Sequence, residues 1–598
     1  MVNTADLQST FPYNLTNPDT IPDEDEDPIY LPQPNTKLNG TQAQAYLNAV
    51  IANVTNVINS APSGASNCTI CKSALAAAKP AARAVPSLVP DAMVNLCKTS
   101  KLHSNATCEE DFLATTFGAI WTQVLAYADV KGLDGNYICQ SIGSFCPRPT
   151  TSPLNATSYF SKTKPADAES RVPKASGRRV KVLHMSDFHL DPRYKVGAEA
   201  SCASSLCCRA NNPNPTSNGT ITLPAALYGS FQCDTPYDLG TAALQAVGPL
   251  TGTSKGGEHL AWTVYTGDLV PHDPQSQLSR ALTEYSEVSV YGMIKQYVTG
   301  PVFAALGNHD SNPEAIDAPH NLPGRLGQQQ SWNYHHVADL WKNDGWIDLG
   351  AANQARTHYG GYSIKTPQGL RIITWNTDFW YRSNFLNYIN TTNPDASGTL
   401  KWMISELQYA EDHNELVWIV GHVLSGWDGT NPLPNPTNLF YQIVERYSPH
   451  VIANVFFGHT HEDQFMIYYA NNGTNQSAGN ALTTGWIGPS VTPLTNLNSG
   501  FRLYEVDTGD FNIYEAYTYY SNVSTFPSLD STGPTYEYEY STRDIYGAQA
   551  NWSTTAPLNA TFWHKVTEAM EKNITLVTLQ NEFQGKLSSK SPNCTNTA

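Results

Sequence analysis

Short apolar runs that end in polar residues recur through the middle of this 598-residue chain. Continuous apolar runs of about four to eight residues with many β-branched members are typical of buried strands. Segments with apolar residues at helical spacing lie between several of the runs, at 282–297 and 397–412. This alternation predicts a layered α/β architecture. The six runs stand at 180–191, 259–273, 301–310, 370–380, 416–428 and 451–463.

The flanks of this central region follow other patterns. Residues 111–130 carry apolar side chains at roughly helical spacing, which favours the core of a small helical bundle. Beyond about residue 500, strict alternation predicts antiparallel strands that close a sheet, and a further helix is expected at 557–582. Residues 1–40 are Pro-rich and acidic, so we expect an extended or disordered arm.

These changes of pattern divide the chain into five parts. We expect an acidic, Pro-rich arm, a six-cysteine helical unit, a linker rich in Ser, Thr, Lys and Pro, a central α/β unit and a helical C-terminal region. Their bounds are 1–63, 64–150, 151–178, 179–525 and 526–598.

Charge and glycosylation motifs narrow the protein class. The net charge of −17 argues against a protein that grips nucleic-acid backbones. No apolar run is long enough for a membrane span. The first residues, MVNTADLQST, are no signal peptide, yet the chain holds 15 N-x-S/T motifs without Pro at x, so we expect a secreted protein whose signal peptide was removed before residue 1. The glycosylation candidates are Asn67, Asn105, Asn155, Asn218, Asn390, Asn472, Asn522, Asn551, Asn559 and Asn573.

The 11 cysteines form two even-numbered clusters and one single residue, Cys594. Even clusters favour disulfide frameworks in an oxidising compartment. The alternative for the first cluster is structural zinc, which is disfavoured because only one C-x-x-C motif occurs there. The first cluster is Cys68, Cys71, Cys97, Cys108, Cys139 and Cys146, and the second is Cys202, Cys207, Cys208 and Cys233.

Polar residues with metal-ligand chemistry follow five of the predicted strands. Ligands of open α/β sheets bind beyond the carboxyl ends of strands, so these side chains are expected to converge. Imidazole and carboxylate together suit zinc, iron or manganese. A lone His after a strand is more often a hydrogen-bonded turn residue, but five such motifs in order favour a metal site. The residues are Asp187, His189, Asp268, Asn308, His309, His422, His459 and His461.

The series DFH, GD, GNHD, GH and GHTH resembles the calcineurin-like metallophosphoesterase superfamily. GDLVPHD, the paired cysteines after DFH and the six-cysteine unit resemble the acid sphingomyelinase family, in which a saposin-type domain precedes the catalytic domain. The resemblance covers about 64–525. It implies an α/β (α+β) metallophosphoesterase with a layered β-sandwich flanked by helices, a small all-α saposin-like N-terminal domain and a helical C-terminal region.

The same resemblance implies disulfide pairs. In the saposin-like unit these are Cys68–Cys146, Cys71–Cys139 and Cys97–Cys108. In the catalytic unit they are Cys202–Cys207 and Cys208–Cys233.

The resemblance also implies two zinc ions, although other divalent transition metals fit the ligand types. Asp187, His189 and His461 would hold one ion, Asn308, His422 and His459 the other, and Asp268 would bridge both. A purple acid phosphatase would carry a Tyr ligand where this chain has Pro271, which disfavours an iron–tyrosinate site.

A hydroxide that bridges the two metals would attack phosphorus, and the leaving alcohol would then need an acid. His309, which the resemblance points at the substrate, is the first candidate and His272 the second. The alternative role for His272 is that of a partner to Asp268.

The resemblance predicts a monomeric phosphodiesterase that cleaves sphingomyelin into ceramide and phosphocholine at the bilayer surface. Residues 64–150 carry seven Lys/Arg and six Asp/Glu, so this unit becomes positive at acidic pH and is able to approach anionic lipid. The alternative is that the unit only packs on the catalytic domain. An ordinary His is protonated in acid, which favours an extracellular or a lysosome- or vacuole-like acidic compartment. The alternatives are a phosphodiesterase for nucleotides, other small diesters or other phospholipids, and a lipid-binding protein without activity.

Overall fold

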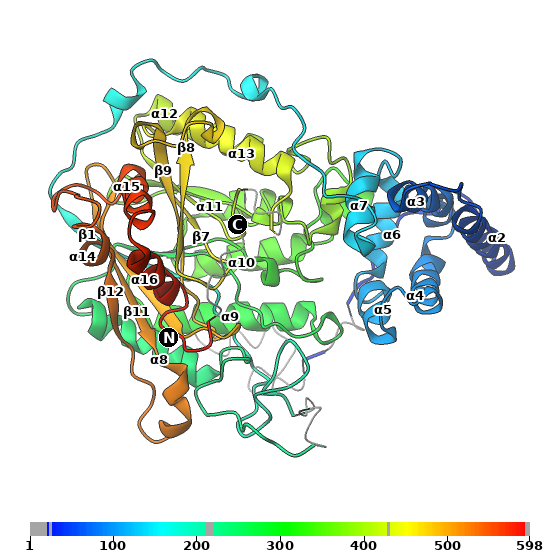
Figure 1. The fold of residues 1–598 in the computed structure, drawn as a ribbon, viewed down its shortest axis with the longest axis horizontal. Coiled ribbons are helices and arrows are strands. Elements are labelled where there is room, and N and C mark those ends of the chain that lie inside the picture. Colours follow the sequence, from blue (N-terminus) through cyan, green and yellow to red (C-terminus); the bar gives the residue numbers. More distant parts are fainter. Residues whose placement is uncertain (1–20, 23–26, 211–213, 215–218, 427–430, 592–598) are drawn as a thin grey trace.

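Two six-stranded mixed sheets form the centre of the molecule, with helices on their outer faces (Figure 1). The computed structural model describes residues 21–22, 27–210, 214, 219–426 and 431–591. The glycosylation candidate Asn218, the single Cys594 and most of the expected arm at 1–40 therefore lie outside the described residues.

The first sheet has the strand order β12-β11-β10-β1-β2-β3. Strands β1, β2 and β3 pair in parallel, with β3 at one edge, whereas β1 with β10, β10 with β11 and β11 with β12 pair antiparallel. The antiparallel pairing predicted beyond residue 500 is thus confirmed. The strands are β1 Arg179–Met185, β2 Trp262–Tyr265, β3 Val302–Ala304, β10 Ser499–Asp507, β11 Ile513–Ser521 and β12 Glu537–Ser541.

The second sheet has the order β4-β5-β6-β7-β9-β8, with antiparallel strands at both edges. Each of the six apolar runs contains a strand of one of the two sheets, as predicted. The facing sheets share one core, in which the fully buried Trp262 and Trp418 rings meet edge to face at 5.4 Å. The strands are β4 Tyr362–Lys365, β5 Arg371–Thr374, β6 Val417–Val420, β7 Ile452–Phe457, β8 Gln464–Tyr469 and β9 Ala481–Ile487.

Helices cover both sheets. The segments predicted at 282–297 and 397–412 form α9 and α12. The Ser279 side chain accepts from Leu282 N and so caps the start of α9. The covering helices are α8 Tyr237–Thr251, α9 Arg280–Tyr297, α10 Ser331–Asn343, α11 Leu349–Thr357, α12 Thr399–Asp412 and α13 Pro434–Tyr447.

A separate bundle of helices projects from one side of the sandwich and appears blue to light blue in Figure 1. Residues 40–59, which lie within the expected first part of the chain at 1–63, form helix α2. This helix begins at a capping box formed by Asn39 and Gln42. The predicted stripe at 111–130 divides between α5 and α6. Gly118 packs on the Phe112 carbonyl, where a Cβ atom would lie 2.1 Å from the oxygen, so a straight helix gives way to a turn. The helices are α2 Gly40–Asn59, α3 Asn67–Ala84, α4 Val89–Ser100, α5 Asn105–Phe112, α6 Gly118–Tyr127 and α7 Leu133–Gly143.

Aromatic stacking joins the helical unit to the sandwich. Trp121 stacks on Phe385 with ring centroids 4.4 Å apart. The Asp134 carboxylate accepts from Thr391 N at 2.8 Å, Thr391 Oγ1 at 2.6 Å and Asn390 N at 3.0 Å. Charged acceptors of this kind make the stronger hydrogen bonds of proteins, so the contact is specific.

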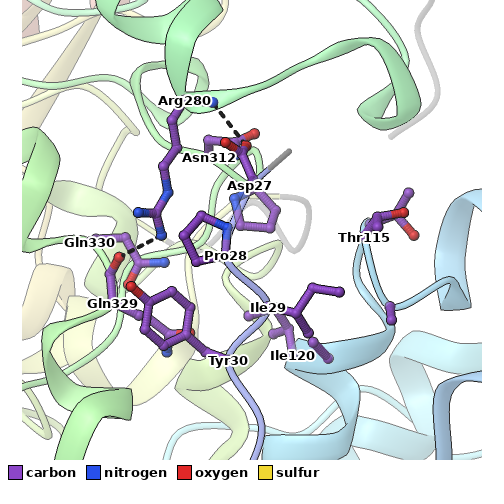
Figure 2. Close-up of a pocket in the computed structure, with 14 residues that line it drawn as sticks. Asp27, Pro28, Ile29, Tyr30, Thr115, Ile120, Arg280, Asn312, Gln329 and Gln330 are labelled. Carbon is purple, nitrogen blue, oxygen red and sulfur yellow. Dashed lines mark hydrogen bonds between the residues drawn. The ribbon is translucent and has the colours of Figure 1, made fainter. Parts of the chain in front are cut away.

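The segment Asp27–Tyr30 lines a pocket between the helical unit and the sandwich (Figure 2). Asp27 accepts from Arg280 N at 2.9 Å and from Asn312 Nδ2 at 2.6 Å. The Tyr30 carbonyl accepts from Gln123 Nε2 at 2.9 Å. This segment therefore ties α6 to the sandwich.

The C-terminal region belongs to the same body. β12 adds an edge strand, so the first sheet continues past residue 525. The single helix expected at 557–582 is two helices, α15 Ala560–Met570 and α16 Ile574–Gln584, because Asn573 caps α16 by accepting from Thr575 N. Among the described residues, no helix has both the length and the apolar character needed to cross a membrane.

Candidate metal centre

The predicted ligand residues converge at the carboxyl ends of β1, β2, β3, β6 and β7. Asp187 and His189 follow β1, Asp268 follows β2, and Asn308 follows β3. His422 follows β6, and both His459 and His461 follow β7. All seven are buried except His459, which is half-buried. The strand ends thus place one polar cluster inside an otherwise apolar sandwich.

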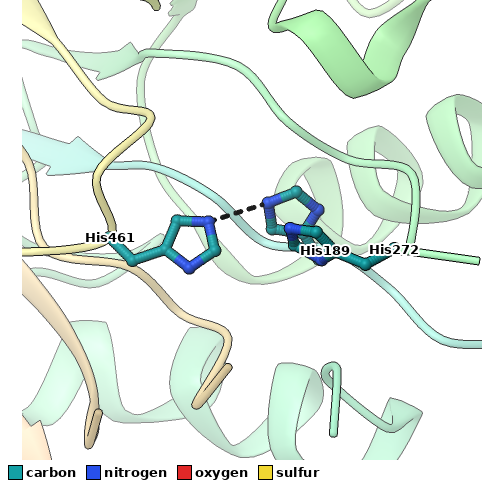
Figure 3. A group of neighbouring side chains, drawn as sticks. All are labelled: His189, His272 and His461. Atoms are coloured by element: carbon teal, nitrogen blue, oxygen red, sulfur yellow. Dashed lines mark hydrogen bonds between the residues drawn. The ribbon is translucent and has the colours of Figure 1, made fainter. Parts of the chain in front are cut away.

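Asp187, His189, Asp268 and His461 form one half of the cluster, each offering a ligand atom within 4.8 Å of the others. His189 Nε2 lies 3.2 Å from His461 Nε2 and 3.4 Å from Asp268 Oδ2. The dashed line in Figure 3 marks the contact between His189 and His461. His461 Nε2 is 3.6 Å from Asp187 Oδ1.

Asn308, His422 and His459 form the other half and share Asp268 with the first. His422 Nε2 lies 3.1 Å from Asp268 Oδ2 and 3.0 Å from Asn308 Oδ1. His459 Nδ1 is 2.8 Å from Asn308 Oδ1. Asp268 Oδ2 therefore faces imidazole nitrogens of both halves, as the bridging role requires.

The hydrogen bonds on the far side of each ring fix which nitrogen carries the proton. Nδ1 of His189, His422 and His461 points at the carbonyls of Val270, Thr266 and Leu494, so each Nδ1 is a donor. His459 Nε2 lies 2.9 Å from Asn431 Oδ1, which makes Nε2 its donor.

In the neutral form of each ring, the remaining nitrogen therefore presents a lone pair to the other imidazoles and to carboxylate or amide oxygens. Acceptors at about 3 Å with no proton between them repel, unless a cation lies among them. Metal-ligating histidines carry this outer hydrogen bond as a rule. The donor set thus fits two divalent metal ions.

Backbone strain is concentrated at the same residues. Positive φ angles occur at Asp187 (50°), His189 (41°), Asp268 (65°), His459 (74°) and His461 (63°). Residues other than glycine rarely adopt this conformation, and it costs free energy that the surrounding fold must offset. Such clustering is typical of functional sites.

Burial keeps three of the four imidazoles in the form that binds metal, whereas at His422 burial is outweighed by the Asp268 carboxylate, which raises the pKa to about 9. Burial lowers the pKa of His189 to about 4 and that of His459 to about 3. A neutral imidazole is the ligand form. Burial also raises the pKa of Asp187 to about 7, since the carboxylate loses its hydration. The protein alone therefore stabilises Asp187 as a carboxylate poorly, which a cation would correct.

Comparison with known proteins identifies the chain. The family profile for the calcineurin-like phosphoesterase domain matches residues 180–463. Sphingomyelin phosphodiesterase 2 of Caenorhabditis elegans is 31% identical over 422 residues, which are 66% of this chain and 63% of that relative. Sphingomyelin phosphodiesterase B of Dictyostelium discoideum is 30% identical over 459 residues, covering 76% of this chain and 67% of that protein. The chain belongs to the sphingomyelin phosphodiesterase family.

One relative of similar identity is named for a nucleotide substrate. The cyclic GMP-AMP phosphodiesterase SMPDL3A of Mus musculus is 31% identical over 388 residues, covering 60% of this chain and 77% of that protein. The alignment with the C. elegans relative spans less than two thirds of its length. Membership of the sphingomyelin phosphodiesterase family thus identifies the fold and the class of centre.

His309 and His272 flank the centre. Both rings lie beside His189, with centroid distances of 4.9 Å for His309 and 4.0 Å for His272. His309 Nδ1 is buried without a partner, and Nε2 lies 3.4 Å from Glu314 Oε1. The partner of His272 is Asp234 and not Asp268, at 3.0 Å from Nδ1 to Oδ1. Burial lowers the pKa of His272, but the Asp234 carboxylate outweighs it and raises the pKa to about 9.

Asp310 is a supporting residue that the sequence motif contains but whose role was not predicted. Its carboxylate accepts from three backbone groups, Gly307 N at 2.8 Å, Asp268 N at 2.9 Å and Leu269 N at 2.6 Å. It therefore joins the loop after β2 to the loop after β3. The motif GNHD, in which Asp310 follows the predicted ligand Asn308 by two residues, was the available signal.

The structure contains the five disulfides that the resemblance implies, namely Cys68–Cys146, Cys71–Cys139, Cys97–Cys108, Cys202–Cys207 and Cys208–Cys233. Disulfides in this number indicate an oxidising compartment. Of the glycosylation candidates within the described residues, Asn522 and Asn559 are half-buried and the others are exposed. Glycosylation itself stays a prediction.

Proposed function

We propose that the protein is a secreted metal-dependent phosphodiesterase that hydrolyses sphingomyelin to ceramide and phosphocholine. The observation that carries this proposal is that imidazole nitrogens of both halves of the cluster converge on Asp268 Oδ2, in a chain of the sphingomyelin phosphodiesterase family. We assign Asp187, His189 and His461 to one metal and Asn308, His422 and His459 to the other. Zinc suits these ligands, and Asp268 is shared.

Two bound divalent cations supply a Lewis acid for the phosphate oxygens and a water of lowered pKa. The chain's own residues set the geometry around them. His309 N donates to Asp268 Oδ1 at 2.8 Å, which leaves Oδ2 facing His189 and His422. The backbone N of His309 thus orients Asp268. Its ring nitrogen Nδ1 has no hydrogen-bond partner, so we infer that the ring faces the substrate.

The leaving alcohol needs a proton, and an imidazole is suited to give one. We propose His309 as the first candidate and His272 as the second. The unpartnered Nδ1 of His309 supports its role as a group that meets substrate.

The helical unit supports a lipid substrate. An entirely apolar pocket lies between its helices, and the unit carries nearly balanced charge. A bilayer substrate has to be presented to a buried centre, and a docked unit with apolar interior suits that task. The pocket is lined by Leu75, Met93, Phe112, Trp121, Val124, Leu125, Ile138 and Ile142.

We further propose a monomer that acts at the bilayer surface in an extracellular or a lysosome- or vacuole-like acidic compartment. The disulfides and the exposed glycosylation motifs support this setting. The five-part division of the chain stays a proposal as well. Its catalytic part would extend to β12 rather than end at residue 525.

A phosphodiesterase for nucleotides is the second candidate, favoured by the identity with the mouse cyclic GMP-AMP phosphodiesterase. The test is release of phosphocholine from sphingomyelin vesicles at about pH 5, beside cyclic dinucleotides and nucleoside triphosphates. We expect vesicle turnover that is lost in Asp268→Asn. Turnover of nucleotides alone would refute the lipid proposal and keep the metal centre.

A further inference from the structure

Asp234 is a buried carboxylate beside the centre that no sequence motif indicated. It is fully buried, and every contact that the structure gives its side chain is a donor. His272 N donates to Oδ2 at 2.7 Å, and His272 Nδ1 lies 3.0 Å from Oδ1 and 3.1 Å from Oδ2. Thr492 Oγ1 donates to Oδ1 at 3.1 Å. One carboxylate therefore holds both the backbone and the ring of His272.

Two anchors fix the backbone of Asp234. The residue before it, Cys233, is bonded to Cys208, and both cysteines are fully buried. The residue after it, Thr235, donates from N to the His189 carbonyl at 3.1 Å and accepts from Asp191 N at 2.8 Å. Asp234 is thus held between a disulfide and the loop that carries His189.

Cys208, the other cysteine of this disulfide, is followed in the chain by the buried Arg209. Arg209 bridges Asp191 and Asp273, and its Nη2 lies 2.6 Å from Asp273 Oδ2. Asp273 is the neighbour of His272 in the chain. The residues after Cys208 and after Cys233 therefore both brace the turn that carries His272.

We propose that Asp234 is the positioning residue of His272, and that the Cys208–Cys233 disulfide holds Asp234 in place. A carboxylate only accepts, so it fixes the proton on Nδ1 and leaves Nε2 free for the substrate side. An amide in its place would also be able to donate, and it would no longer define the tautomer or the ring orientation. The proposal rests on the proposed phosphodiesterase activity but not on the lipid substrate.

The experiment compares Asp234→Asn, His272→Ala and the double variant on bis(p-nitrophenyl) phosphate, with metal content measured for each. Outer hydrogen-bond partners of this kind are worth about 10–100-fold in activity. We expect kcat of Asp234→Asn to fall by about 10–100-fold with KM nearly unchanged and full metal content. The double variant should be no slower than His272→Ala, because Asp234 acts through His272. Asp238→Asn, an exposed carboxylate in the same segment, is the matched control.

Three results would overturn the proposal. The first is a double variant in which the kcat losses of the two single variants multiply. The second is an Asp234→Asn variant that loses metal in proportion to its activity. The third is an Asp234→Asn variant that keeps the wild-type kcat. A crystal structure of Asp234→Asn tests the positioning role without an activity assay. We expect the His272 ring to rotate while the predicted metal ligands keep their positions. Turnover of the diester without turnover of sphingomyelin vesicles would refute the lipid proposal alone.

Discussion

The metal centre collects side chains from five strand ends between Asp187 and His461, whereas the helical unit closes on itself through three disulfides within 64–150. The centre depends on contacts between residues far apart in sequence. The helical unit depends on local cross-links and an apolar interior. Chemistry and presentation of the substrate are therefore expected to fail separately, and substitutions should be able to remove one without the other.

The largest expected effect is on the centre. In Asp268→Asn the two halves lose the carboxylate that both contact. A metal's electrostatic contribution is worth several kcal/mol, so we expect turnover of every diester to fall by at least about 10²–10³-fold. Hydrolysis of bis(p-nitrophenyl) phosphate and metal content are the measurements. Near wild-type turnover would contradict the bridging role, and Asp238→Asn is the control.

Next comes a change that breaks the helical unit alone. Cys71→Ala with Cys139→Ala removes a disulfide whose cysteines are 68 residues apart. Loss of such a disulfide costs about 2–5 kcal/mol, which is enough to loosen a small unit. We expect vesicle turnover to be lost while the soluble diester is still hydrolysed at the wild-type rate. Equal losses on both substrates would show that the two regions are not separable.

A smaller effect is expected at the junction between the regions. Asp134→Asn weakens three hydrogen bonds to the Asn390–Thr391 segment. Hydrogen bonds to charged groups are worth about 1.5–3 kcal/mol, so the free energy of unfolding should fall by about that amount. Hydrogen exchange at residues 385–391 should rise. Asp91→Asn, exposed in the first turn of α4, should leave this segment protected.

The smallest effect concerns acid tolerance of the sandwich. Burial raises the pKa of Glu411, but hydrogen bonds from Arg446 and His450 lower it to about 2 from the usual 4.5. The folded pKa is depressed, so this carboxylate stabilises the fold above about pH 4.5 and loses that contribution as the pH falls towards 2. In Glu411→Gln, the urea concentration at the midpoint of unfolding should change less between pH 4.5 and pH 2 than it does in the wild type. An unchanged slope would refute the assignment.

The sequence predicted the residues of the candidate metal centre better than the residues that hold them in place. Asp187, His189 and the other predicted ligands follow apolar strands directly, so local pattern and strand order sufficed to place them in one cluster. Asp234 was missed because its partner His272 lies 38 residues away and no motif joins them. The break between α5 and α6 was missed because apolar spacing continues across Gly118, where tertiary packing decides the turn. β12 was missed although Glu and Tyr alternate strictly through Glu537–Ser541, so a strand signal was present in the sequence.

We expect two metal ions to lie within this cluster. The most direct measurement is anomalous X-ray scattering from crystals of the purified protein at the zinc edge. We predict two peaks per chain, one among Asp187, His189 and His461 and one among Asn308, His422 and His459, with Asp268 between them. A single peak, or peaks elsewhere, in protein that hydrolyses phosphodiesters would contradict the account.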